Sequence, residues 1–163
     1  MRRLTIRIDL VSPTLIGSGT GFGSVIDADI VFDETGIPFI PSKRIKGLLR
    51  DSAQEMVDAF SKAGINWLSP DIIEQTFGKG GDEKPAPVYF SDLTIKEYES
   101  VKGWLDYLRL NRKFNKYISA HTIINFFTEM RQQTSIDERT GAAEEHSLRT
   151  IRLAKKGLSF EGT

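Results

Sequence analysis

Two aspartates separated by one residue have the chemistry to act on a phosphodiester. Asp27 and Asp29 follow a glycine-rich stretch and lie in residues 25–33, where apolar and polar residues alternate. In an extended strand this alternation sends both carboxylates to the same face. Carboxylate oxygens, with water completing the shell, can hold Mg²⁺ and so assist attack on a phosphodiester. Both are candidate catalytic residues, and the alternative is a pair of solvated acids on an exposed strand face.

Several basic residues lie in the first turns of a predicted amphipathic helix, where they could bind a phosphate group. A helix start offers free backbone donors and the positive end of the helix dipole. The candidate contacts are one hydroxyl residue, in the predicted N-cap position, and four basic residues: Ser42, Lys43, Arg44, Lys46 and Arg50. Gly47 inside this helix predicts close packing or a close approach of another backbone. The alternative is an ordinary solvated helix face.

A glycine loop precedes the two aspartates. Every second residue from Gly17 to Gly23 is glycine, so the loop has little side-chain bulk and a ligand could approach Ser18 and Gly19 closely. The loop lacks the Gly-Lys-Ser/Thr of a phosphate-binding P-loop and the strand-to-helix setting of a dinucleotide site. A flexible hairpin loop without a ligand is the alternative.

A second basic cluster combines cations with aromatic rings. Arg109, Arg112, Lys113 and Lys116 are interleaved with tyrosine and phenylalanine, a mixture typical of single-stranded nucleic-acid binding and also of an ordinary amphipathic surface. The two histidines, His121 and His146, lack the spacing and companions of a zinc site or a catalytic triad, and we interpret both as structural.

The elements that must position these residues form an α+β pattern. In order, we expect a strand at 3–11, an alternating strand at 25–33 with a turn at 34–36, a helix from 42 to about 60, an irregular connection at 62–87 with a short helix near 71–77, a strand at 88–95, an unassigned stretch at 97–132, a polar hairpin-like excursion at 134–143, and weak alternation at 147–160. This order predicts one domain over residues 1–163, with helices on one face of an antiparallel sheet.

Composition narrows the class of protein. The 163 residues include no cysteine, which excludes a disulfide scaffold and a cysteine-ligated zinc site. No apolar run is long enough to span a membrane, so we expect a cytoplasmic protein with no membrane partner. With 22 basic and 22 acidic residues the formal charge is zero, so any nucleic-acid site must be a local patch.

Several of these pieces, in this order, resemble the RAMP superfamily, in particular the backbone subunits of type III CRISPR effector complexes. The pieces are Leu15–Gly19 after the first strand, Ile26–Ser42 as a central hairpin, Ile45–Arg50 as a first helix, Thr76–Gly78, Val88–Leu93, and Ile136–Glu145 with Leu148 and Arg149 as a thumb-like hairpin. The order and spacing of the pieces carry the resemblance more than any single one.

The resemblance implies a ferredoxin-like, RNA-recognition-type core that polymerises along a guide RNA (crRNA). Its partners would be crRNA, target RNA, other CRISPR effector subunits and further copies of itself. The loop, helix and basic-cluster candidates, among them Arg112 and Lys113, would then contact RNA. A thumb-like insertion at about residues 120–150, carrying Ile136 and Arg139, would intercalate and displace one base pair. Asp27 matches the position of the aspartate that cuts target RNA with Mg²⁺, although Asp29 offers a second carboxylate, so which one acts stays open.

The end of the chain departs from the family pattern. A further helix and a glycine- and arginine-rich strand usually follow the thumb, whereas this sequence stops at Phe160–Thr163. We therefore expect a core that is incomplete at the C-terminus. Either another chain or a neighbouring subunit supplies the remainder, or the sequence is one piece of a split or truncated protein. Three functions stay open: a guide-binding subunit that is a metal-dependent endoribonuclease, the same subunit without catalysis, and a domain that binds a small phosphate ligand.

Overall fold

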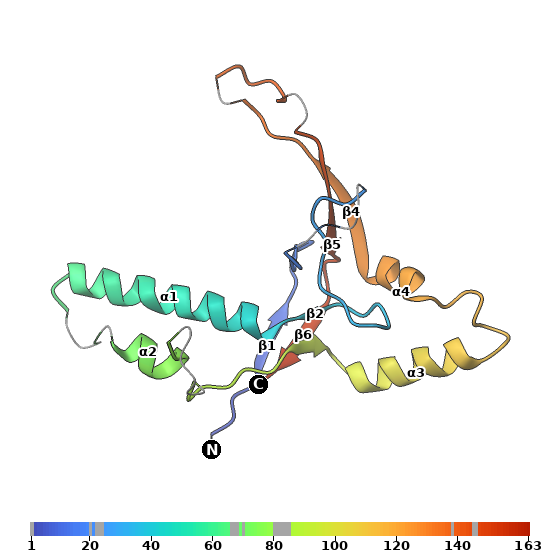
Figure 1. The fold of residues 1–163 in the computed structure, drawn as a ribbon, viewed down its shortest axis with the longest axis horizontal. Helices are drawn as coiled ribbons and strands as arrows, with labels where there is room; N and C mark the ends of the chain where they lie inside the picture. Colours follow the sequence, from blue (N-terminus) through green and yellow to red (C-terminus); the bar gives the residue numbers. More distant parts are fainter. Residues whose placement is uncertain are drawn as a thin grey trace.

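A small antiparallel sheet lies at the centre of the chain, between two long helices and below a projecting hairpin (Figure 1). The computed structural model describes residues 2–19, 21, 25–65, 69, 71–79, 86–137, 139–144 and 147–163. Its elements are β1 (Ile6–Asp9), β2 (Phe39–Ile40), α1 (Ser42–Lys62), α2 (Asp71–Phe77), β3 (Leu93–Ile95), α3 (Tyr98–Leu110), α4 (Ala120–Phe127), β4 (Thr128–Gln133), β5 (Arg149–Ala154) and β6 (Ser159–Gly162). The α+β class with an antiparallel sheet is confirmed.

The central sheet has the strand order β1-β6-β3-β2, and every pairing in it is antiparallel. The last strand, β6, lies between β1 and β3. Its Phe160 is opposite Ile8 on one side and Ile95 on the other, which aligns three apolar side chains on one face. The next row, with Arg7 opposite Glu161, faces the other way. The sheet therefore has one buried face and one polar face.

The helices cover the apolar face. Phe160 and Leu93 are fully buried, and Ile45 of α1 joins the same cluster as Ile123 and Phe127 of α4. Three residues of α3, Tyr98, Val101 and Leu105, pack against this cluster. Burial of one such large apolar side chain contributes about 1.5–3 kcal/mol. The predicted arrangement, with helices on one face of the sheet, is confirmed.

The predicted helices agree with the structure more closely than the predicted strands do. The long helix after Pro41 and the short helix at 71–77 are confirmed. The expected strand at 88–95 is wrong in its first part, because only Leu93–Ile95 pairs as a strand. The unassigned stretch contains α3, α4 and β4. No helix among the described residues is long and apolar enough to cross a membrane.

Residues 25–33 are not the regular strand that we predicted. They form isolated bridges instead of a ladder, and the described partners differ from one bridge to the next: Ile30 is opposite Gly17, Ala28 opposite Ile151 and Phe32 opposite Pro38. No single neighbour runs alongside for long enough to make a ladder. Ile30 is buried as the alternation predicts, whereas Phe32 is 38% exposed.

A tight turn leads from this segment toward α1. One oxygen of Asp33 accepts hydrogen bonds from the backbone amides of Thr35 and Ile37, both at 2.9 Å. The other accepts the Tyr98 hydroxyl of α3 at 2.7 Å. Burial and then this hydrogen bond raise the pKa of Tyr98. Gly36 within the turn has φ of 96°, a conformation that favours glycine.

The hairpin β4–β5 projects away from the central sheet (Figure 1). Its ladder runs from the Thr128–Ala154 pair to the Gln133–Arg149 pair. Beyond that ladder the two arms are joined less regularly, by the bridge between Ile136 and Ala143 and by side-chain hydrogen bonds of Ser147 to Thr134 and Ser135. This hairpin is the thumb-like excursion that the sequence predicts.

Candidate nucleic-acid interface

The glycine loop is held against the segment that carries the two aspartates. The Ser18 amide donates to the Asp29 carbonyl at 2.9 Å, and the Val31 amide donates to the Ile16 carbonyl at 3.0 Å. Gly19 then turns with φ of 86°. Thr20 and residues 22–24 of the loop lie outside the described residues. The described part of the loop is therefore anchored at its base to the backbone of Asp29.

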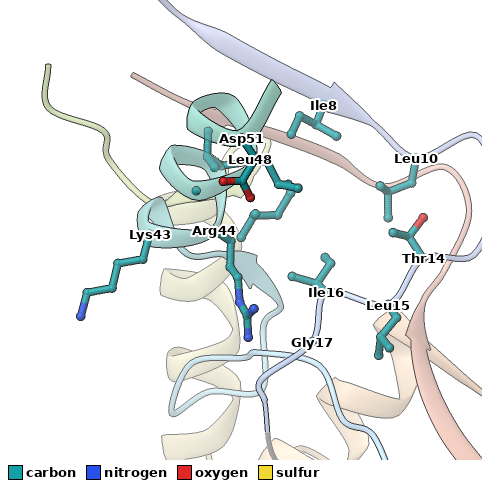
Figure 2. A pocket seen from close by; sticks show the side chains of 13 residues that line it. Ile8, Leu10, Thr14, Leu15, Ile16, Gly17, Lys43, Arg44, Leu48 and Asp51 are labelled. Atoms are coloured by element: carbon teal, nitrogen blue, oxygen red, sulfur yellow. The ribbon is translucent and has the colours of Figure 1, made fainter. Parts of the chain in front are cut away.

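The structure brings this loop together with the basic helix start. A Cβ atom on Gly19 would lie 3.5 Å from Nη2 of Arg44, so the guanidinium lies directly against the loop. Figure 2 shows Arg44 extending toward the strand that carries Gly17, and Lys43 extending outward. Lys43, Lys46 and Arg50 recur at spacings of three and four residues and so share one side of α1. Two separate candidates from the sequence thus form one surface.

A cavity of about 510 Å³ lies between the loop and α1 (Figure 2). Apolar residues of β1, the following loop and α1 form most of its wall, among them Ile8, Ile16 and Ile45, while its charged residues are two cations and one carboxylate: Lys43, Arg44 and Asp51. A Cβ atom on Gly47, which also lines the cavity, would meet nothing within 4 Å. The expected close packing at Gly47 is therefore wrong for this chain alone. An apolar hollow with cations beside it suits a group that carries both a flat ring and a phosphate.

The helix start differs from the prediction. Pro41 is the N-cap, Ser42 is the first helical residue, and no side chain of the N-cap bonds the helix. The Ser42 amide donates instead to Oδ1 of Asp92 at 2.7 Å. The Arg44 and Ile45 amides bond the Pro41 carbonyl. Because these three donors are occupied, the basic side chains are the main groups that remain for an anion.

Asp27 is exposed and fixed at its backbone. Its amide donates to the Thr150 carbonyl at 2.8 Å, and its Oδ2 accepts from the Thr150 amide at 2.7 Å. No residue in the described part of the chain donates a hydrogen bond to Oδ1. The side chain therefore has one oxygen available to solvent at the base of the hairpin.

Asp29 is in a different environment from Asp27, although the alternation predicted that both carboxylates lie on one face. It is only 5% exposed, and both its oxygens accept from Nη1 of Arg152, at 3.2 and 3.3 Å. Its Oδ1 also accepts the Ile30 amide at 2.7 Å. A buried carboxylate with a buried cation beside it is a structural group, because removing its charge would leave Arg152 unpaired. We therefore withdraw Asp29 as a catalytic candidate.

The described residues do not form a metal site by themselves. No group of three or more histidine, aspartate or glutamate side chains gathers in the described ranges. With Asp29 paired to Arg152, Asp27 supplies a single carboxylate oxygen. One carboxylate does not hold Mg²⁺ unless other ligands, such as phosphate oxygens, complete the shell. The protein groups alone do not fit the expected ion, and we derive no chemical step through it.

The second basic cluster is not part of this surface. Arg109 lies in the last turn of α3, and Arg112, Lys113 and Lys116 follow in an exposed stretch. The Lys113 and Lys116 ammonium groups lie over the rings of Phe114 and Tyr117 at 5.6 and 4.9 Å. In Figure 1, α1 extends to the left of the central strands and α3 to the right, so the two helices extend away from each other.

The thumb candidates lie at the far end of the hairpin. Ile136 is 64% exposed, and the Arg139 amide donates to Oδ1 of Asp137 at 2.8 Å in a tight turn.

His121 lies on α4 and bonds Asn125 at 3.0 Å. His146 falls outside the described residues. The roles of Arg152 and Asp92 could not be predicted from the sequence, because each bonds a residue far away along the chain, Asp29 and Ser42 respectively.

Comparison with known proteins agrees with this arrangement. A sequence profile of the RAMP superfamily matches residues 7–162, nearly the whole chain. The chain belongs to the RAMP superfamily. A chain of the type III-B Cmr-beta structure bound to cognate target RNA shares its fold, with a TM-score of 0.59 and 16% identity over 97% of this chain and 81% of that chain. A chain of the apo structure gives a TM-score of 0.57 with the same identity and coverage. No curated protein matches the sequence.

Proposed function

We propose that this RAMP chain is a guide-RNA-binding subunit of a type III CRISPR effector complex. The observation that carries the proposal is the contact between Arg44 and the glycine loop at Gly19, beside a cavity that Lys43 also lines. Cations hold phosphates and leave the bases free for pairing, which is what a guide-binding protein requires. Family membership and the likeness to a chain from a structure bound to target RNA support the same function. Partners would be crRNA, target RNA, other effector subunits and copies of this chain.

Binding of single-stranded RNA at several salt concentrations tests this proposal. The test variant replaces the four basic residues in the N-terminal half of α1 by alanine: Lys43, Arg44, Lys46 and Arg50. Each phosphate contact contributes about 0.7 to the slope of log affinity against log salt for single strands, so the slope should fall by up to about 3. The charge-matched control replaces four exposed lysines elsewhere: Lys62, Lys79, Lys96 and Lys156.

The control should keep the wild-type slope. If the test variant binds RNA with unchanged affinity and slope, the basic helix is not the binding surface. If the wild type binds inorganic phosphate or nucleotides but no RNA, the small phosphate-ligand function replaces the present proposal.

Cleavage of target RNA at Asp27 is a second candidate function. The supporting observation is that one oxygen of Asp27 accepts no hydrogen bond from any described residue, while its backbone is fixed to Thr150. Asp27→Asn keeps an acceptor for the Thr150 amide and removes the charge. In a complex assembled with guide and target, with Mg²⁺ supplied, this variant should lose cleavage and keep guide binding. Asp58→Asn, on the exposed side of α1, is the control and should cut normally.

Chelation gives an independent check on the metal. Cleavage should stop when Mg²⁺ is removed and return when it is restored. Full activity of the Asp27 variant would remove the assignment, and cutting in the presence of chelator would remove the metal. If the wild-type complex binds target and never cuts it, the subunit is a structural one without catalysis.

A further inference from the structure

A second cavity, of about 480 Å³, lies at the base of the hairpin and is distinct from the one beside α1. It is enclosed by the segment before Asp27, by α4 and by the first residues of the β4–β5 ladder. Val25, Ile26, Ile124 and Met130 give it an apolar wall. Its polar residues are few, namely His121, Asn125 and Arg152.

The guanidinium in this wall is buried and paired. Arg152 is only 7% exposed, and its bonds to Asp29 all come from Nη1. Its Nε has no hydrogen-bond partner in the described part of the chain, but it is covered by protein atoms and does not open into the cavity. The choice of occupant therefore depends on the other groups of the wall.

Two flat rings and an amide complete the chemistry. Phe32, 38% exposed, and the His121 imidazole both line the cavity and offer planes for stacking. Asn125, whose side-chain nitrogen lies 3.0 Å from Nε2 of His121, retains its amide oxygen as an acceptor among the described residues. Stacking planes together with donors and acceptors at the edge are how proteins bind an unstacked base.

We propose that this cavity binds one nucleobase of an RNA strand that passes Asp27. The inference rests on the proposed RNA-binding function and adds a base-binding subsite to it. The link is the chain itself, since Val25 and Ile26 of the wall directly precede Asp27. A nucleotide whose base occupies the cavity would have its backbone close to that carboxylate. The subsite would then fix which phosphate lies at Asp27.

An abasic scan of a short single-stranded RNA tests the subsite. Each nucleotide in turn is replaced by an abasic one, and affinity for the wild-type chain is measured. Loss of one stacked base lowers affinity roughly five- to hundredfold. We expect one position in each footprint to show such a loss. In Phe32→Leu, which keeps an apolar wall, and in His121→Ala, that loss should shrink while affinity for the abasic RNA stays unchanged. Trp104→Ala removes an exposed ring of α3 and should leave the profile as in the wild type.

The outcomes separate the subsite from the function on which it rests. RNA binding with a flat abasic profile would overturn the subsite and leave the proposed function intact. Absence of RNA binding by the wild type would overturn both. If the profile is flat and Phe32→Leu instead weakens association with a second copy or another subunit, the cavity receives a protein side chain and the nucleobase is excluded. Arg152 is left unchanged in these variants because its loss would leave the buried Asp29 carboxylate without a cation.

Discussion

Replacing Asp29 by asparagine should destabilise the fold strongly, although the change alters a single atom. Asparagine can still accept the Ile30 amide, so that hydrogen bond survives. The negative charge opposite Arg152 is lost. The two side chains are 6% and 9% exposed, so the guanidinium would remain as an uncompensated charge in the interior.

The magnitude follows from the burial of the pair. Breaking a buried ion pair by removing one partner costs about 3–5 kcal/mol. In a domain of this length each kcal/mol corresponds to a shift of about 2–4 °C in Tm, so Tm should fall by about 6–20 °C. Thermal and denaturant unfolding, followed by circular dichroism, measure this directly. Asp27→Asn, at an exposed carboxylate, should change the unfolding free energy by less than about 1 kcal/mol.

A double variant sharpens the test. Asp29→Asn combined with Arg152→Met removes both charges, so most of the loss caused by Asp29→Asn alone should be recovered. Equal unfolding free energies for Asp29→Asn and Asp27→Asn would refute the structural role of Asp29. A double variant no more stable than the single one would show that the interaction with Arg152 is not the cause.

Two further predictions concern the backbone. Gly36→Ala should lower the unfolding free energy by more than about 1 kcal/mol in chemical denaturation, because φ is 96° and the new Cβ would lie 2.4 Å from the Ala120 carbonyl oxygen. Gly157→Ala has φ of 91° with open space around its Cβ, so it should cost less, and equal costs would contradict the steric explanation. In hydrogen exchange, amides at 134–137 and 139–144 should exchange faster than those of the β4–β5 ladder, because nearly all of these residues are exposed and scattered hydrogen bonds replace the continuous ladder there. Protection as strong as that of the ladder would refute this.

The sequence predicted those elements whose signals are local. The helix α1 follows from its apolar stripe after Pro41, and α2 is a short periodic stretch after Pro70. The stretch at 97–132 could not be assigned, because its aromatic residues suit both helix and strand. In the structure several of them are exposed, including Trp104 and Tyr107, so the pattern does not mark one buried face.

Long-range pairing explains what the sequence could not predict. Alternation at 25–33 indicated extended backbone correctly, yet the partners of that backbone are Gly17, Ile151 and Pro38, and no local signal selects them. The burial of Asp29 depends on Arg152, which is 123 residues away along the chain. Likewise, the loop and the basic helix start were each candidates on their own, and only the fold places Arg44 against Gly19.

RNA that co-purifies with the protein tests the central claim most directly. The chain is expressed together with a CRISPR guide RNA and purified. Its absorbance is then compared at about 260 nm and about 280 nm, the wavelengths at which nucleic acid and protein respectively absorb most strongly. We predict an absorbance ratio well above that of protein alone, guide RNA in the extracted nucleic acid, and a clear decrease in both for the variant with alanine in place of Lys43, Arg44, Lys46 and Arg50. A protein-like ratio for the wild type, or a nucleic-acid content that the variant leaves unchanged, would contradict guide binding at this surface.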